Sequence, residues 1–380
     1  MNTGYLGDNI PKLGFGLMRL PMNGEEVDIE TLKKMVDTFI AKGFTYFDTA
    51  YVYTGGKSEV AAREALVKRY PRESFQLATK LPFWEGVETE ADMQRIFDES
   101  LSRADCGYFD FYLLHAMDKS RFEKAEQIGA WEFLAKLKAE GKIKHMGFSF
   151  HDSADVLDEA LTKHPEAEFV QLQINYADWE NDGVQSRKCY EVCLKHNKPI
   201  VIMEPVKGGS LAGMVPAVQD MLKAVRPELS IPSWAIRFCA GLDNIVTVLS
   251  GMSNEEQVND NVSYMEHFEP LNAEEQETLK KAVEVLNSIP TIPCTACRYC
   301  TDGCPMKIDI PQIFKVVNGF KQFGYAAGTD KPYNAGEYAR VTKDGGKAGE
   351  CLQCGACESH CPQHISIIEE LKAAAAEYEK

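Results

Sequence analysis

Short apolar runs alternate with segments of helical period through the first 285 residues. Most runs are continuously apolar rather than alternating, as expected of strands that are covered on both faces of a sheet. The runs are LGFGLMRL (13–20), FTYF (44–47), FQLA (75–78), FDFYLL (109–114), IKHMGFSF (143–150), FVQLQI (169–174), PIVIM (199–203) and NIVTVL (244–249). Eight strand–helix repeats over about 250 residues predict an α/β fold, a (β/α)8 TIM barrel.

The segments between the runs have the features of amphipathic helices. The first predicted helix has an apolar stripe of Leu32, Met35, Val36, Phe39 and Ile40. This stripe is followed by Gly43, a candidate C′ glycine that would end the helix. A second helix is predicted to begin at Thr89, because Asp92 stands in the position that completes a capping box. A doubly wound open sheet is the alternative, but it usually carries G-x-G-x-x-G after its first strand, and this chain continues there into Pro21.

The length and the charge of the chain restrict the number of domains and the kinds of partner that we expect. At 380 residues the chain exceeds the roughly 250–300 residues at which a single core stops growing, so two domains are expected. With 57 acidic against 41 basic residues and no basic block, neither nucleic acid nor an anionic membrane is an expected partner. The amino terminus lacks a signal pattern, and no apolar stretch approaches the ~20 residues of a membrane span, so we expect a soluble, cytoplasmic protein.

Eight of the twelve cysteines fall into two short runs near the carboxyl end. Both runs read C-x2-C-x2-C-x3-C-P, the pattern of bacterial two-cluster ferredoxins, in which three thiolates hold one 4Fe-4S cluster and the fourth crosses to the other. The rule assigns Cys294, Cys297, Cys300 and Cys361 to one cluster, and Cys351, Cys354, Cys357 and Cys304 to the second. The sequence therefore predicts a barrel over residues 1–285 and a small helical, loop-rich, ferredoxin-like domain over residues 286–380.

Zinc and disulfides are the alternatives for these cysteines. Zinc takes four thiolates, often from two C-x2-C pairs, but does not need this longer pattern twice. Disulfides need an oxidising compartment, which the missing signal disfavours. A domain this small buries little apolar surface, so cluster binding should supply much of its folding free energy. The segment between the runs, rich in Gly, Tyr and Lys, is predicted to be loop-rich.

Titratable residues close three successive apolar runs. Asp48 follows the second run, Lys80 the third and His115 the fourth, while Tyr53 lies on the loop after Asp48. In a TIM barrel the carboxyl ends of the strands meet at the active face. Each residue alone could be a helix cap or packing, but together they suit carbonyl reduction. Tyr53 would donate the proton, with its pKa lowered by the Lys80 ammonium group, Asp48 would anchor the lysine, and His115 would orient the substrate oxygen.

These residues resemble the aldo-keto reductase family over residues 10–270. FDTAYVY is similar to the family's D-T-A-x-x-Y segment, and TK, LLH, QLQINY and EPVKGGSL follow in the family's order. The resemblance implies Asp48, Tyr53, Lys80 and His115 as the catalytic residues, with Tyr53 as general acid. It also implies a nicotinamide cofactor, held by Ser149, Gln173, Glu204, Gly208, Gly209, Leu211, Gly251, Asp260 and Asn261. The combination of barrel and two-cluster domain resembles a bacterial subgroup of this family.

Three positions depart from the family pattern. Phe150 stands where the family commonly has an Asn that contacts the carboxamide, and Met203 stands where many members stack an aromatic ring on the nicotinamide. The segment that resembles the adenine-end loop, residues 250–261, carries Glu255 and Glu256 and no Lys or Arg. NADPH brings an extra phosphate that basic residues usually bind. We therefore expect NADH to be favoured, or the preference to be weak.

Two functions follow from the two halves. The first is an enzyme that reduces a small aldehyde or ketone, or oxidises the alcohol, with clusters that are structural, regulatory or pass electrons to a redox partner. The second is an electron-transfer or redox-sensing protein whose barrel binds nucleotide with little turnover. A hydride carries two electrons and a 4Fe-4S cluster accepts one, and no convincing flavin site is present to split the pair. The complete set of four polar residues favours the enzyme.

Overall fold

The computed structural model describes residues 6–7, 9–301, 303–326, 329–332 and 334–380. The chain divides into two compact units. The barrel unit comprises the residues up to Pro205 together with Ser233–Leu271, and the helical unit comprises Val206–Pro232 together with Asn272–Lys380. The domain boundary that we expect at residue 285 stays a prediction.

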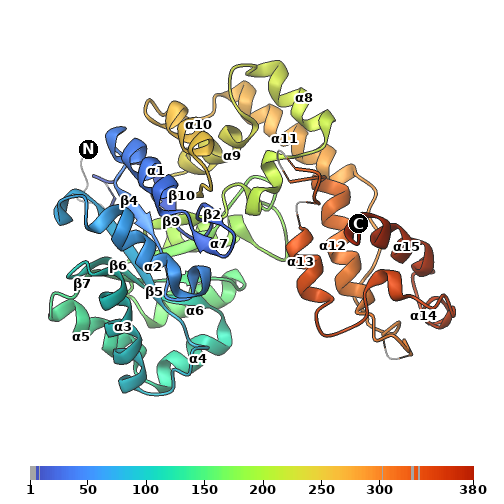
Figure 1. Ribbon diagram of the computed structural model, residues 1–380, viewed down its shortest axis with the longest axis horizontal. Coiled ribbons are helices and arrows are strands. Elements are labelled where there is room, and N and C mark those ends of the chain that lie inside the picture. The colour runs from blue at the N-terminus through green and yellow to red at the C-terminus, as the bar shows by residue number, and fades with distance from the viewer. Residues whose placement is uncertain (1–5, 8, 302, 327–328, 333) are drawn as a thin grey trace. The chain divides into compact units, whose positions relative to one another are not determined.

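Eight parallel strands close the predicted barrel, and helices cover its outer side (Figure 1). The order around the barrel is β1, β10, β9, β8, β7, β6, β5 and β4, and β4 pairs again with β1. The strands are β1 (Leu13–Gly16), β4 (Tyr46–Asp48), β5 (Gln76–Leu81), β6 (Phe109–Met117), β7 (Ile143–Phe150), β8 (Phe169–Gln173), β9 (Ile200–Met203) and β10 (Ile245–Gly251). Each of the eight predicted runs supplies one strand, so the predicted fold is confirmed.

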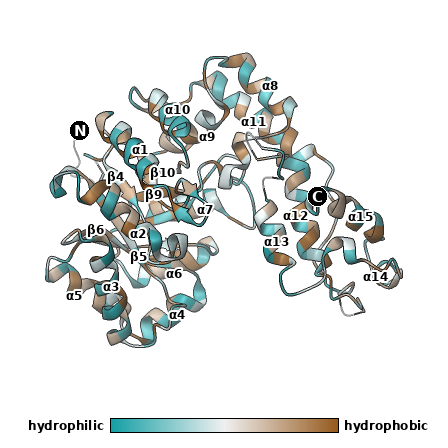
Figure 2. Cartoon of the chain, viewed as in Figure 1, coloured by the Kyte–Doolittle hydropathy of each residue, from teal (hydrophilic) through white to brown (hydrophobic). Residues whose placement is uncertain are grey.

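The helices around the barrel are amphipathic, and their ribbons carry both teal and brown segments in Figure 2. They are α1 (Ile29–Ala41), α2 (Lys57–Ala62), α3 (Glu90–Ala104), α4 (Lys119–Gln127), α5 (Ala130–Ala139), α6 (Ala154–Lys163), α7 (Ser186–Lys195), α9 (Ile231–Ala240) and α10 (Glu255–Met265). Gly43 has the positive φ, 84°, of a C′ residue. The predicted capping box between Thr89 and Asp92 is present. The first predicted strand is shorter than expected, because the chain turns after Gly16 and forms a small hairpin, β2 (Met22–Asn23) and β3 (Glu26–Val27).

The barrel interior is filled by apolar side chains from the strands. They include Tyr46, Ala78, Phe111, Leu113, Phe169, Val201, Val246 and Leu249. Successive side chains of a strand point to opposite faces, so a residue two positions further on points inward as well. Asp48, Lys80 and His115 stand two positions beyond Tyr46, Ala78 and Leu113, respectively. The period of the sheet therefore directs all three polar side chains to the carboxyl end of the barrel interior.

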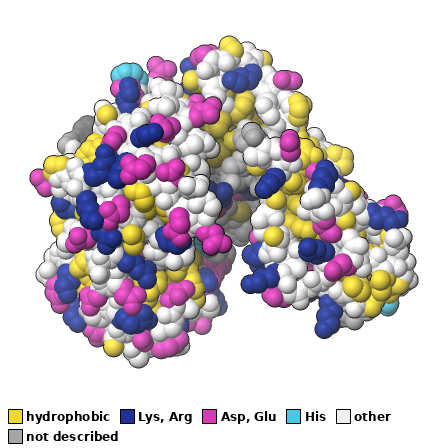
Figure 3. All heavy atoms as spheres, in the orientation of Figure 1, with side chains coloured by type: hydrophobic (Ala, Val, Ile, Leu, Met, Phe, Trp, Pro, Cys, Tyr) yellow, Lys and Arg dark blue, Asp and Glu magenta, His cyan; other side chains and the backbone are white. Residues whose placement is uncertain are grey.

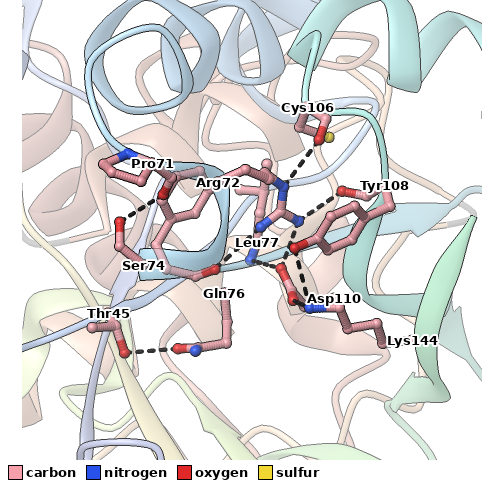
Figure 4. A network of polar contacts seen from close by, with 11 residues as sticks. Thr45, Pro71, Arg72, Ser74, Gln76, Leu77, Cys106, Tyr108, Asp110 and Lys144 are labelled. Atoms are coloured by element: carbon pink, nitrogen blue, oxygen red, sulfur yellow. Dashed lines mark hydrogen bonds and ion pairs between the residues drawn. The ribbon is translucent and has the colours of Figure 1, made fainter.

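A polar network ties the strands together at their amino ends (Figure 4). Arg72 donates to Asp110 at 2.6 Å and to the carbonyl oxygens of Cys106 and Tyr108 at 3.0 and 2.7 Å. The buried Asp110 carboxylate also accepts from the backbone N–H of Leu77 at 2.9 Å and from Lys144 at 2.9 Å. This network joins the starts of β5, β6 and β7, opposite to the strand ends that carry Asp48, Lys80 and His115.

The helical unit is built around its own apolar core, which includes Ile313, Phe314, Val317 and Leu371. Its helices are α8 (Pro216–Val225), α11 (Ala273–Ser288), α12 (Ile310–Phe323), α13 (Ala335–Val341), α14 (Ala356–Ser359) and α15 (Ile367–Tyr378). The segment between the cysteine runs is less loop-rich than expected, because α12 packs on α13 and α15. None of the described helices combines the length and the apolar composition needed to cross a bilayer. Figure 3 shows acidic and basic side chains interspersed over the visible surface of the barrel unit.

Candidate active site and cluster-binding sites

Lys80 lies at the centre of the carboxyl end of the barrel. Its ammonium group donates to Asp48 Oδ1 at 2.6 Å and to the carbonyl oxygen of Thr49 at 2.7 Å, and all three residues are buried. Burial, the largest single effect, would lower the pKa of Lys80, but the charges and hydrogen bonds of Asp48 and Tyr53 together outweigh burial, and the net pKa is raised. Lys80 is therefore a permanent cation at neutral pH.

Tyr53 reaches Lys80 from the tight turn that follows β4. Thr54, Gly55 and Gly56 all have positive φ, at 53°, 62° and 86°, and this turn returns the chain toward the barrel. Lys80 Nζ lies 4.8 Å from the centroid of the Tyr53 ring. Burial raises the pKa of Tyr53 above its usual 10.0, while the Lys80 ammonium opposes the rise. The expectation of a lowered pKa for Tyr53 was therefore wrong, because desolvation of the phenolate exceeds the attraction of Lys80.

His115 lies against Tyr53, with the ring centroids 5.8 Å apart in an edge-to-face arrangement. Burial, with the charge of Lys80, holds the pKa of His115 well below its usual 6.5. A neutral imidazole can donate one hydrogen bond to a carbonyl oxygen without giving up a proton. The structure thus brings all four predicted residues together at one end of the barrel.

An irregularity in β6 sets the position of His115. Ala116 has a positive φ of 53°, and the pairing of β6 with β7 shifts register between Leu114 and Met117. The Ala116 N–H donates to Ser149 Oγ at 2.7 Å, and its carbonyl oxygen accepts from Arg121 at 2.7 Å. Bulges of this kind occur beside active sites, where they redirect a side chain. No local pattern in the sequence marks this one.

An aromatic and a cationic side chain border His115. The Trp84 ring centroid lies 5.1 Å from that of His115, and the Arg121 guanidinium lies 5.3 Å from the Trp84 ring. Trp84 is 46% exposed, which suits contact with a bound molecule. Trp84 follows the end of β5 by three residues, whereas no pattern in the sequence points to Arg121.

The predicted nucleotide-binding residues are divided between the two units. Ser149, Gln173, Glu204, Gly251, Asp260 and Asn261 belong to the barrel unit, and Gly208, Gly209 and Leu211 belong to the helical unit. Asn261 is buried, donates to Ser250 Oγ at 2.6 Å and accepts from the Tyr264 hydroxyl at 2.7 Å, so both ends of its amide are already bonded within the protein. The cofactor contacts of all nine residues stay predictions.

A basic residue that the sequence analysis missed lies beside the predicted adenine-end loop. The Arg19 side chain packs over Gly251, where an added Cβ would lie 3.5 Å from Arg19 Cδ. The Arg19 carbonyl oxygen accepts from Ser253 Oγ at 3.0 Å. Among the described residues no side chain pairs with the exposed guanidinium of Arg19. Arg19 is more than 230 residues before this loop, so only the closure of β1 against β10 reveals the contact.

The eight clustered cysteines line two hollows in the helical unit. One hollow is lined by Cys304, Cys351, Cys354 and Cys357. The second is lined by Cys294, Cys297, Cys300 and Cys361. The fourth cysteine of each run thus lies with the three leading cysteines of the other run. The matching sets of four cysteines suit two groups of the same kind.

The residues around the hollows fit iron–sulfur clusters. Each hollow has four thiols, and apolar side chains such as Ile310 and Phe314 form other parts of the walls. A single zinc ion needs sulfurs about 2.3 Å from one point. Within the described part of the chain no three His, Cys, Asp or Glu side chains converge in that way. The cysteines instead surround a space, as the ligands of a cubane cluster do.

Known aldo-keto reductases are similar to part of this chain. A 26% identical relative over 265 residues is the NADH-specific methylglyoxal reductase of Escherichia coli, with 58% of this chain and 78% of that protein aligned. A Glycine max protein named as an aldo-keto reductase is 31% identical over 226 residues, which cover 56% of this chain and 61% of that protein. The structure of an aldo-keto reductase from Klebsiella pneumoniae in complex with NADPH has a TM-score of 0.59, with 22% identity, 72% of this chain and 90% of that chain covered, and it shows the same fold.

Two family models match the chain, one over the barrel strands and one over the cysteine runs. The model of the 4Fe-4S dicluster domain matches residues 293–366, which contain both cysteine runs. The model of the aldo/keto reductase family matches residues 12–284, which contain all eight barrel strands. With this match over most of its length, the chain belongs to the aldo/keto reductase family and carries a 4Fe-4S dicluster domain after the barrel.

Proposed function

We propose that the protein is an NAD(P)-dependent oxidoreductase that reduces a small aldehyde or ketone with NAD(P)H, or oxidises the corresponding alcohol with NAD(P)+ in the reverse reaction. The observation that carries the proposal is the buried Lys80–Asp48 ion pair beneath Tyr53 and His115. A barrel kept only as a scaffold has no use for an ammonium group held against a phenol.

The four residues divide the work of carbonyl reduction. NAD(P)H, when bound, supplies a hydride to the carbonyl carbon. Tyr53, which burial keeps protonated, gives its proton to the carbonyl oxygen, so the carbonyl gains one hydride and one proton and becomes an alcohol. Lys80 stabilises the resulting phenolate, and Asp48 holds Lys80 in place. The neutral His115 donates a hydrogen bond that orients the substrate oxygen.

For the cofactor we propose that NADH is favoured or that the preference is weak. Glu255 and Glu256 occupy the first turn of α10, and their negative charges would repel the extra phosphate of NADPH if it bound at this loop. Arg19 lies against this loop and Lys34 Nζ lies 3.8 Å from Glu255 Oε1, so two cations beside the loop would keep NADPH acceptable. The E. coli relative is named NADH-specific and acts on methylglyoxal, so small 2-oxoaldehydes belong among the first substrates to test. A preference for NADPH of tenfold or more would contradict the proposal.

We further propose that the domain over residues 286–380 holds two 4Fe-4S clusters, one in each cysteine-lined hollow. Ligation would follow the crossed assignment of the two runs. The clusters would be structural, regulatory or a route for single electrons to a redox partner. Cluster-binding thiols and buried free cysteines persist in a reducing compartment, which supports a cytoplasmic location.

The second candidate is an electron-transfer or redox-sensing protein with little carbonyl reduction. Its support is that Cys297 and Cys354, one ligand in each proposed set, are exposed, so an electron could reach either cluster from the surface. This function does not explain the arrangement around Lys80. The enzyme therefore remains our first proposal.

The test is oxidation of NADH by a panel of small carbonyl compounds under argon. We expect turnover that falls by ~10²–10⁴-fold in Tyr53→Phe, because the proton donor is lost while the ring remains. Tyr70→Phe, which changes a tyrosine bonded to Asp37 on the surface, is the matched control and should keep full activity. Bleaching of the clusters by NADH alone, without carbonyl turnover, would favour the electron-transfer protein and overturn the proposal.

A further inference from the structure

Ser149 already uses one of its hydrogen-bonding positions within the protein. Its Oγ accepts the Ala116 N–H at 2.7 Å, and the side chain is almost fully buried. A hydroxyl that accepts one hydrogen bond still has its own hydrogen to donate. Toward a ligand at the end of β7, Ser149 therefore acts as a donor.

Gln173 is held at both its backbone and its side chain. Its carbonyl oxygen accepts from Ser186 Oγ at 2.9 Å, and its Nε2 faces Asp178 Oδ2 at 3.4 Å. The opposite orientation of the amide would place Oε1 against the Asp178 carboxylate, where the two oxygens would repel each other. The contact with Asp178 therefore turns Oε1 of Gln173 away from the carboxylate. On that side Oε1 can accept a hydrogen bond from a ligand.

The Asp178 carboxylate is itself fixed. It is 1% exposed, its Oδ2 accepts from Asn175 Nδ2 at 2.9 Å, and its backbone N–H donates to Asn175 Oδ1 at 2.8 Å. Asn175 also donates to the carbonyl oxygen of Glu204 at 3.3 Å, which ties the arrangement to the residue after β9. A buried carboxylate held in this way is a rigid reference for the Gln173 amide.

We propose that Asp178 is a positioning residue that sets the orientation of the Gln173 amide, so that Ser149 and Gln173 bind the nicotinamide carboxamide in one orientation. Ser149 donates to the carboxamide oxygen, and Gln173 Oε1 accepts from the carboxamide NH2. If the Gln173 side-chain amide were turned over, its NH2 group would face the NH2 group of the carboxamide, and the hydrogen bond between Gln173 and the carboxamide would be lost. The inference rests on the proposed function, because it requires a nicotinamide at this site.

The test uses a cofactor analogue that keeps the oxygen but lacks the NH2. Reduced 3-acetylpyridine adenine dinucleotide has a methyl group in place of the carboxamide NH2. Affinities for NADH and for this analogue are measured by calorimetry under argon, on the full-length protein and without a carbonyl substrate. We expect the unchanged protein to bind NADH about tenfold more tightly than the analogue, the effect of one hydrogen bond lost with a buried acceptor left unpaired.

In Asp178→Asn the preference should fall to about twofold or less, since an asparagine amide can accept either orientation of Gln173. Gln173→Leu should abolish the preference for NADH over the analogue. The double variant, Asp178→Asn with Gln173→Leu, should show the same preference as Gln173→Leu alone, because both changes act on one hydrogen bond. Asp182→Asn is the matched control, since Asp182 lies four residues further on and is 94% exposed, and it should keep the preference. Asn175→Ala, which loosens Asp178 without removing the carboxylate, serves if Asp178→Asn does not fold, and it should reduce the preference partly.

Two results would overturn the inference separately from the proposed function. If Asp178→Asn binds NADH and keeps the tenfold preference, or weakens both ligands equally, Asp178 is only structural. If the unchanged protein binds both ligands equally, the carboxamide is not recognised in this way. If it binds neither NADH nor NADPH, the proposed function fails and the inference fails with it.

Discussion

The Asp48–Lys80 pair, the neutral His115 and the protonated Tyr53 leave the side chains of the site without net charge. The lysine and aspartate neutralise each other at 2.6 Å. Desolvation, together with the charge of Lys80, keeps His115 uncharged, and desolvation keeps the Tyr53 proton in place. Such a site places its one mobile proton next to the substrate oxygen. The charge that develops on Tyr53 during proton transfer then meets the fixed charge of Lys80.

The first prediction concerns pH. The pKa of His115 is lowered well below 6.5 and that of Tyr53 is raised above 10.0, so neither group changes protonation near neutrality. We expect kcat/KM for carbonyl reduction with NADH to be flat from roughly pH 6 to pH 9, the range between the two shifted values. Steady-state rates across this range provide the measurement. A titration near pH 7 that disappears in His115→Gln would show that the imidazole is charged in the working enzyme.

The second prediction concerns Arg19. Replacing Arg19 by Met keeps the packing over Gly251 but removes one of the positive charges beside the predicted adenine-end loop, while Lys34 stays in place. We expect KM for NADPH to rise about five- to tenfold, as for the loss of one partly exposed charge pair, with KM for NADH unchanged. Arg340→Met, at an exposed position of the helical unit, gives the comparison. Equal changes in KM for both cofactors would show that Arg19 does not contact the phosphate.

At the scale of strands and helices, the spacing of apolar residues along the sequence was enough to predict most of the barrel. The eight apolar runs become the eight strands, and the alternation along β4, β5 and β6 already points Asp48, Lys80 and His115 inward. The features that sequence analysis could not give depend on contacts between distant elements. The bulge at Ala116 is held by Ser149 and Arg121, and no pattern within β6 announces it.

The same limit applies to charges and burial. The absence of Lys and Arg from residues 250–261 is plain in the sequence, but Arg19 reaches that loop through the pairing of β1 with β10. The pKa of Tyr53 depends on how deeply the turn after β4 buries the phenol, and composition cannot supply that depth. The cysteine spacing, by contrast, was enough to predict which cysteines lie together. In each hollow the fourth cysteine of one run lies with the first three cysteines of the other run.

The third prediction tests the polar network at the amino ends of the strands. Asp110→Ala leaves the Arg72 guanidinium, with only 17% of its side chain exposed, without its carboxylate. We expect the barrel unit to lose about 3–5 kcal/mol of stability, the usual result of breaking a buried ion pair. Because Asp110 lies at the opposite end of β6 from His115, kcat at low temperature should not change.

Lys144→Gln removes a half-exposed partner of the same carboxylate and should cost under about 1 kcal/mol. Thermal unfolding followed by circular dichroism compares the two, and similar losses would contradict this account.

At the scale of the whole molecule, the proposed clusters act as covalent links within the helical unit. Each set of four cysteines joins residues from both runs, with α12 and α13 between them in the sequence. Links between distant residues reduce the freedom of the unfolded chain, and cluster binding adds its own free energy to folding. The barrel unit has a separate core and none of these cysteines. Loss of the clusters should therefore unfold the cysteine-rich part while the barrel stays folded.

The fourth prediction separates crossed ligation from ligation within each run. Under the crossed assignment, Cys294 and Cys361 belong to one cluster, so Cys294→Ser with Cys361→Ser should retain one cluster's iron. Cys294→Ser with Cys304→Ser removes a ligand from each cluster and should lose both. If each run held its own cluster, the two double variants would exchange these results. Iron per chain and the electron paramagnetic resonance of the reduced protein, prepared anaerobically, decide between the two. Retention of secondary structure by the barrel in both variants would show that the loss of iron reports on ligation and not on collapse of the whole chain.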